Sequence, residues 1–229
     1  MYKIGQYKKS DSMNELICEN YKMLLVISRF DIPLGFGNKT IDEVCKENSV
    51  DVDVFLAIVN LLVEDEAHII VLKSNKSIIN LINYLKNSHK YFLDFKLPSI
   101  RENLKKAIPE NVEDVSLVIM KYFDEYVLEV KKHMSYEEKN VFPYVEKLIM
   151  GERDNNYNIK IFSKQHDQIE SKLSELKNII IKYYVAKSSN ELNSVLFDIF
   201  TCAEDLLSHN NIEDNLFVPT IFDLENKKL

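Results

Sequence analysis

The sequence predicts an all-α protein: an up-down-up-down, antiparallel four-helix bundle preceded by a small helical domain. Three observations lead to this fold class. Only four Gly and five Pro occur in 229 residues, which favours long helices over a sheet with many turns. Apolar residues recur at steps of three and four along the second part of the chain. The links between those segments are short and polar, which makes sequential helices antiparallel neighbours.

The first part of the chain predicts three helices within a domain over residues 1–70. A helix over 12–29 runs into a predicted turn over 30–38, which holds two Gly and a Pro. The capping-box pattern Thr40-Ile-Asp-Glu43 then opens a short second helix. A third helix is expected over 51–62.

The second part, residues 77–219, predicts the bundle itself. Its four helices are expected at about 77–106, 112–149, 157–184 and 190–214. A 3-4 alternation of apolar residues marks the inward face of each helix. In the third helix this face is predicted to comprise Ile159, Phe162, His166, Ile169, Leu173, Leu176, Ile180 and Tyr183.

Four of the five histidines lie on these inward faces, one in each helix, and two glutamates lie there with them. The run HMSYEEKNVFP at 133–143 and the run HNNIEDNLFVP at 209–219 share His-x-x-x-Glu and a Pro in the same place. Residues four apart on a helix stand one above the other, so each such pair can reach one centre. The candidate ligands are His89, His133, Glu137, His166, His209 and Glu213.

A bound cation explains these buried carboxylates, because an ionised carboxylate without a partner is costly to bury. Four imidazoles and two carboxylates fit two metal ions, each with two His, bridged by the two Glu. Imidazole and carboxylate ligands with open positions in a bundle suit iron better than a closed zinc site.

Simpler explanations exist for each residue alone. A lone buried His is more often a hydrogen-bonded core residue, and one His-x-x-x-Glu is near chance. The combination of two pairs and two further His favours a metal site. Glu129, Glu138 and Asp214 are candidates for orienting the imidazoles, with exposed helix acids as the alternative. Glu170 is an extra ligand, an acceptor behind a ligand, or a surface residue.

Composition excludes several classes of partner. The net charge of −7 argues against nucleic acid. The N-terminus lacks the apolar core of a signal peptide, and charges interrupt the apolar stretches, so no membrane span is expected. Three separated cysteines indicate reduced thiols. The expected location is the cytoplasm.

The order His89, His133-x-x-x-Glu137, His166, His209-x-x-x-Glu213 resembles the hemerythrin-like domain of the repair-of-iron-centres (RIC) family. The resemblance implies two non-haem iron ions, oxo- or hydroxo-bridged, with these six residues as ligands. The segment FDIPLGFGNKTIDEVCKENSVDVDVFLAIVNLL is similar to the short N-terminal domain of that family. This chain has Leu34-Gly35 where RIC proteins usually carry an adjacent Cys-Cys pair, so any mechanism that needs vicinal thiols is in question.

The resemblance implies repair or protection of iron-sulfur clusters under nitrosative or oxidative stress, by iron delivery or by handling of NO. Expected partners are NO or O2 and client iron-sulfur proteins, with no nucleic acid, no membrane and a homodimer as one oligomeric option. The alternative is an O2 or NO sensor or binding module that signals through the N-terminal helices. A third hypothesis gives the metal a purely structural role. The sequence does not establish whether the protein is an enzyme.

Overall fold

The structure is a computed structural model that describes residues 6–64, 69–108, 113–152, 157–164, 167–184 and 190–227. The regular elements in these ranges are helices. One isolated β-bridge, between Ser12 and Thr40, also occurs there. The all-α prediction is confirmed. Contacts divide the chain into two compact units. The first comprises Met1–Ser88, Tyr144–Lys160 and Asn211–Leu229, and the second comprises His89–Pro143 and Ile161–Asn210.

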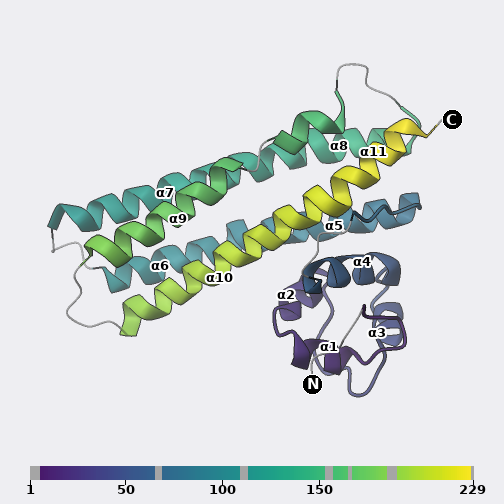
Figure 1. Ribbon diagram of the computed structural model, residues 1–229, viewed down its shortest axis with the longest axis horizontal. Coiled ribbons are helices and arrows are strands. Elements are labelled where there is room, and N and C mark those ends of the chain that lie inside the picture. The colour runs from purple at the N-terminus through teal and green to yellow at the C-terminus, as the bar shows by residue number, and fades with distance from the viewer. Residues whose placement is uncertain are drawn as a thin grey trace. The chain divides into compact units, whose positions relative to one another are not determined.

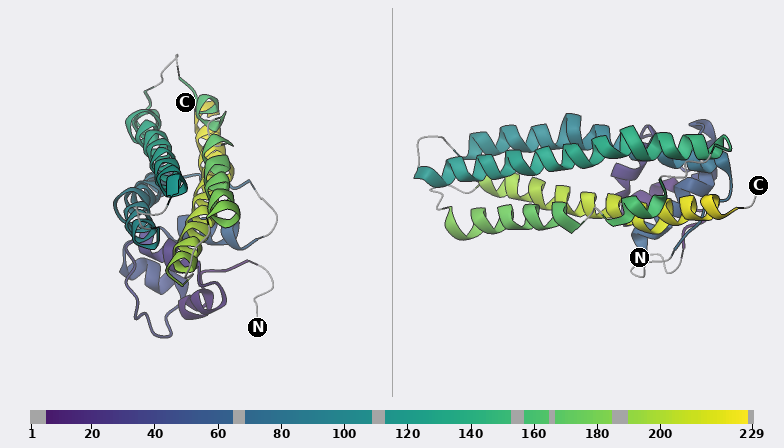
Figure 2. Two further views of the ribbon diagram at one scale, coloured as in Figure 1. Left: turned by 90° about the vertical axis from the view of Figure 1, so that its left-hand side faces the viewer. Right: turned by 90° about the horizontal axis from the view of Figure 1, so that it is seen from above.

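The second unit is the four-helix bundle. Its sequential helices run antiparallel and side by side (Figures 1 and 2): η1 with α6 (Tyr91–Lys96 and Leu97–Ala107), α7 (Glu113–Tyr136), α9 (Asp167–Tyr183) and α10 (Asn190–Ile212). Each helix contributes buried apolar side chains to one core, as the alternation at steps of three and four requires. The central members are Phe92, Leu104, Ile119, Phe123, Tyr126, Val130, Leu176, Ile180, Ile199 and Cys202.

The predicted inward face of the third helix is corrected at both ends. Ile159–Lys164 forms a 3-10 helix, η3, ahead of α9 rather than one continuous α-helix. Tyr183 was expected in the core but is 67% exposed. It is the last residue of α9, at the end of the bundle, where a ring with a polar tip can reach water.

Three of the long helices pass through a π-helical turn. The turns are η1, η2 (Glu137–Val141) and η4 (Glu213–Phe217), and each ends two residues before a proline. Proline has no N–H for the carbonyl four residues back, and a local change of winding accommodates it. The helices resume as α6, α8 (Phe142–Ile149) and α11 (Val218–Asn226). The predicted end near 214 is therefore wrong, because the last helix continues to Asn226.

In the first unit, the predicted helix over 12–29 is two helices, α1 (Met13–Glu19) and α2 (Met23–Arg29). The break follows from contacts with Tyr7, whose hydroxyl donates to Glu19 Oε2 at 2.7 Å and accepts from Asn20 Nδ2 at 2.9 Å. These long-range hydrogen bonds hold the chain at the end of α1, where neither Gly nor Pro interrupts the pattern.

The next two helices of this unit begin as predicted. Thr40 and Glu43 form the capping box of α3 (Ile41–Glu47). The Thr40 backbone N–H, donated to Glu43, holds the pKa of that carboxyl below its ordinary value. Asp51 caps α4 (Val52–Val63) by accepting from the Asp53 and Val54 amides. The assignment of residues 1–70 to a domain of their own, apart from 77–219, stays a prediction.

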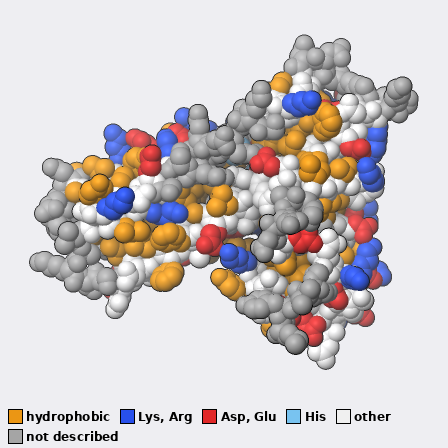
Figure 3. All heavy atoms as spheres, in the orientation of Figure 1, with side chains coloured by type: hydrophobic (Ala, Val, Ile, Leu, Met, Phe, Trp, Pro, Cys, Tyr) orange, Lys and Arg blue, Asp and Glu red, His pale blue; other side chains and the backbone are white. Residues whose placement is uncertain are grey.

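The surface of the described residues is mixed in character. On the face drawn in Figure 3, hydrophobic side chains lie between basic and acidic groups. Several large apolar side chains are exposed, among them Leu117, Leu128 and Phe197 on the bundle. None of the described helices combines the length and the apolar character needed to cross a membrane.

Candidate metal centre

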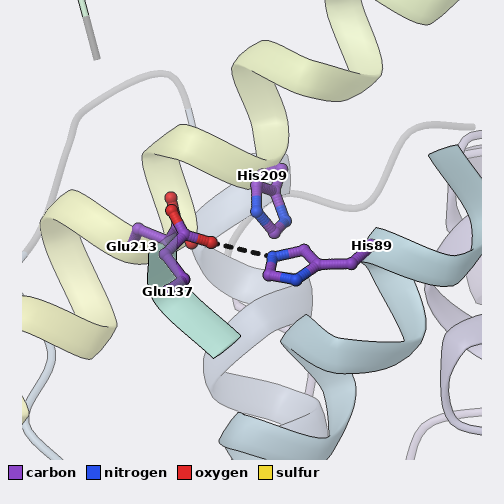
Figure 4. Close-up of side chains that lie close together, drawn as sticks. All are labelled: His89, Glu137, His209 and Glu213. Carbon is purple, nitrogen blue, oxygen red and sulfur yellow. Dashed lines mark ion pairs between the residues drawn. The ribbon is translucent and has the colours of Figure 1, made fainter. Parts of the chain in front are cut away.

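Four of the six predicted ligands lie together and are fully buried. His89, Glu137, His209 and Glu213 each offer a ligand atom, and these atoms all lie within 4.8 Å of one another. Each of the four side chains is at most 1% exposed. Figure 4 shows the two carboxylates and the two imidazoles turned toward one another. The residues come from α5 (Asn75–Lys90), η2, α10 and η4, so the cluster depends on the folded chain rather than on one segment.

Glu137 contacts two imidazoles through its two oxygens. Its Oε2 lies 2.8 Å from His89 Nε2, and its Oε1 lies 2.7 Å from His133 Nε2. His133, the fifth predicted ligand, is 8% exposed. Atoms that bind one ion at about 2.1 Å lie roughly 3 Å apart, which is the spacing seen here. The arrangement suits a carboxylate shared between two centres.

His89 lies between two carboxylates. Its Nδ1 is 3.0 Å from Glu138 Oε1, on the side of the ring away from Glu137. A carboxylate accepts, so Nδ1 carries the proton and donates to Glu138. A cation bound at the cluster would then take the lone pair of Nε2. Carboxylates placed in this way fix the tautomer and ring orientation of ligating imidazoles.

Replacing Glu138 with Ala is expected to weaken Fe²⁺ binding about tenfold, because the His89 ring loses the acceptor that orients it. Competition against a chelator of known affinity measures the change. Glu125→Ala is the matched control, because Glu125 is an exposed acid on α7 that pairs with Lys121, and it should leave the affinity unchanged. Equal affinities for both variants would contradict the role given to Glu138.

Aromatic rings surround the cluster. The His89 ring stacks on Phe142 at 5.7 Å, and the His133 ring stacks on Phe162 at 6.2 Å. Phe92 meets His209 edge to face at 6.0 Å. These apolar contacts hold the imidazoles in place and keep bulk water away, which strengthens electrostatic interactions at the centre.

Two of the three π turns carry the glutamates, a feature that the sequence-based predictions do not include. Glu137 begins η2 and Glu213 begins η4. On a regular α-helix, residues four apart point in directions that differ by about 40° around the helix axis. A π turn cancels part of this rotation. The sequence pattern that indicates a π turn is a series of core residues spaced four apart, close to a proline. Its buried members are His133, Glu137, Val141, Val145 and His209, Glu213, Phe217, Ile221.

The donor set fits a cation. Two carboxylates within 4.8 Å of each other repel when ionised, so a proton or a positive ion must lie between them. Imidazole nitrogen and carboxylate oxygen together suit a divalent transition metal such as iron. His89, Glu137, His209 and Glu213 would hold it directly, and His133 stands on the other oxygen of Glu137.

The remaining predicted residues are placed less completely. His166 and the side chain of Glu170 lie outside the described residues. Glu129, a candidate for orienting His133, forms an ion pair with Lys172 across α7 and α9. Asp214 is exposed. The full set of six ligands therefore stays a prediction.

Residues 80–221 match the hemerythrin HHE cation-binding domain, and this match covers more than half of the chain. The chain belongs to the hemerythrin HHE family. No curated protein matches it significantly. The HHE match begins in α5 and ends in α11, so it contains every residue of the cluster. The bundle is thus a hemerythrin-like, metal-binding domain with a His/Glu cluster that can hold a metal ion.

The cysteines of this HHE protein are spread apart. Cys45 is fully buried in α3, and burial raises the pKa of its thiol to about 12. Cys202 is buried in the bundle core, whereas Cys18 is exposed. Leu34 is 69% exposed, and Gly35 has a φ of 99°, which favours glycine.

A thiol-modifying reagent at pH 8 is expected to modify one cysteine per folded chain, Cys18. The reagent reacts with the thiolate form and must reach it, and the other two thiols are buried. Unfolding in denaturant should raise the count to three. Mass spectrometry of labelled peptides identifies the site. Rapid labelling of Cys45 in the folded protein would show that the N-terminal helices open readily.

Proposed function

We propose that this HHE protein is a di-iron protein of the RIC type that repairs or protects iron-sulfur clusters under nitrosative or oxidative stress. The observation that supports it best is the buried cluster of two imidazoles and two carboxylates within 4.8 Å. The proposed ligands are His89, His133, Glu137, His166, His209 and Glu213, with the two glutamates as bridges. The similarity of the first 70 residues to the RIC N-terminal domain supports the finer assignment.

Bound iron would supply open coordination positions for NO or O2 and would be the cargo for delivery to an iron-sulfur protein. The protein's own residues hold and shield it. Glu137 and Glu213 offset its charge, and Glu138 keeps the proton of His89 on Nδ1. Phe92, Phe142 and Phe162 exclude water around the imidazoles. The separated cysteines favour a reducing cytoplasm as the place of action.

Anaerobic purification followed by metal analysis and optical titration with NO and O2 on one sample tests the proposal. About two irons per chain and spectral changes on adding NO are expected. Transfer of iron to an apo iron-sulfur protein should follow if the centre delivers iron. Less than about one iron per intact chain contradicts the di-iron proposal, and another metal at full occupancy redirects it.

A sensor is the second candidate, favoured by the Leu34-Gly35 sequence in place of the cysteine pair. A sensor keeps its iron in the presence of an apo acceptor and binds NO or O2 reversibly. The transfer assay separates the two functions. A metal with a purely structural role would bind neither NO nor O2 and would not be transferred to the apo iron-sulfur protein. Removing that metal would unfold the bundle.

A further inference from the structure

A short strap, residues 70–73, lies against the turn that carries Glu213. The Ile70 N–H donates to the Asn215 carbonyl at 3.0 Å, and the Leu72 N–H donates to Thr220 Oγ1 at 3.0 Å. Lys73 Nζ lies 3.4 Å from both carboxylate oxygens of Asp223. The strap thus follows η4 and α11 for about two turns, entirely within the first unit.

The bond from Ile70 has a local cause. Asn215 lies inside η4, two residues after Glu213, and its carbonyl would accept from residue 219 in a regular α-helix. Residue 219 is a proline and has no N–H. The strap donates an N–H to this carbonyl in place of the missing proline N–H, and so it holds the π turn two residues after Glu213.

The bond to Thr220 is buried. Thr220 is 1% exposed and Leu72 is 7% exposed, so water does not readily replace either partner. Removing the hydroxyl would leave the Leu72 amide without this acceptor inside the protein. Thr220 therefore couples the strap to the first turn of α11, directly after η4.

The strap continues into the N-terminal part of the first unit. Ser77, at the start of α5, donates to Asp51 Oδ2 at 2.8 Å, and Asp51 is the cap of α4. Helix α4 also packs against η4. The N-terminal helices and the Glu213 turn thus share one set of contacts.

We propose that Thr220 is a positioning residue, which through the strap sets the Glu213 turn and so links metal affinity to the state of the N-terminal helices. This inference rests on the proposed iron centre and adds its regulation. Coupling between sites is reciprocal. Iron binding at Glu213 should tighten the strap, and anything that pulls the strap from α11 should release iron.

Two measurements test the link. In the wild-type protein, saturating Fe²⁺ should slow hydrogen exchange of the Ile70 and Leu72 amides about tenfold. The Tyr184 amide, which donates to the Ile180 carbonyl at the end of α9, is the internal control and should not change, because it belongs neither to the strap nor to the N-terminal helices. In chelator competition, Thr220→Val should weaken Fe²⁺ binding about tenfold, and Thr220→Ser, which keeps the hydroxyl, should restore it to within about twofold.

Thr201→Val is the matched control, since Thr201 is exposed on α10 and its hydroxyl donates to the Phe197 and Asp198 carbonyls of its own helix. It should bind Fe²⁺ as the wild type does. Wild-type affinity in Thr220→Val overturns the inference. If that variant does not fold, unchanged exchange of Ile70 and Leu72 on adding Fe²⁺ to the wild type overturns it. Failure of the wild type to bind Fe²⁺ overturns the proposed function as well.

Discussion

Replacing Glu137 with Gln is expected to abolish the stabilisation of the protein by iron. Glu137 contacts His89 and His133 at 2.8 and 2.7 Å and belongs to the four-residue cluster. The amide has almost the same shape but lacks the charge that a bound cation requires. At a free Fe²⁺ concentration about one hundred times the dissociation constant, the wild type gains about 2.7 kcal/mol of unfolding free energy. The variant should gain close to none.

Thermal unfolding with and without Fe²⁺, under anaerobic conditions, measures this difference. For a chain of this size the wild-type midpoint should rise by roughly 5 to 10 °C. Glu129→Gln is the matched control, because Glu129 lies on the same helix and pairs with Lys172. It should keep the full shift. A metal-dependent rise in Glu137→Gln equal to that of the wild type would exclude this carboxylate as a ligand.

The second large effect concerns the bundle core. Phe123 is fully buried on α7 within the cluster of apolar residues from all four helices. Its replacement by Ala removes contacts and leaves a cavity, which costs about 3 to 5 kcal/mol of unfolding free energy. The midpoint of thermal unfolding should fall by roughly 10 °C.

Phe197→Ala is the matched control, since the Phe197 ring is 72% exposed on α10. Its effect should stay within about 0.5 kcal/mol. Both variants should keep the iron content of the wild type, because Phe123 lies four turns of α7 away from Glu137. Similar losses of stability in the two variants would show that the core does not lie where the apolar faces of the helices place it.

The sequence predicts this fold well where local chemistry decides. The capping box at Thr40 and the cap at Asp51 depend on neighbouring residues, and both are present. The inward faces depend on helical periodicity, and their described members are buried, apart from Tyr183. The break between α1 and α2 depends on Tyr7, several residues before α1, and no pattern within 12–29 contains it.

The candidate site divides in the same way. The His-x-x-x-Glu spacing places Glu137 and Glu213 one helical turn after a histidine. This placement depends only on local helix geometry and not on how the helices pack. The acceptor at Glu138 depends on how α5 packs against η2, so the sequence indicates it only as one of several acids. Glu129, one turn before His133, was another of these candidate acids, and it pairs with Lys172. The choice between them is made by tertiary contacts.

The π turns also constrain chain length. Two of them, η2 and η4, each insert a residue between a glutamate and the proline that follows it, at 137–143 and at 213–219. A deletion of a single residue there would return the helix to regular winding and rotate everything beyond it by about 100°. Val145 and Ile221, both fully buried, would then face outward. Gaps in this stretch should therefore be tolerated less than changes of residue type.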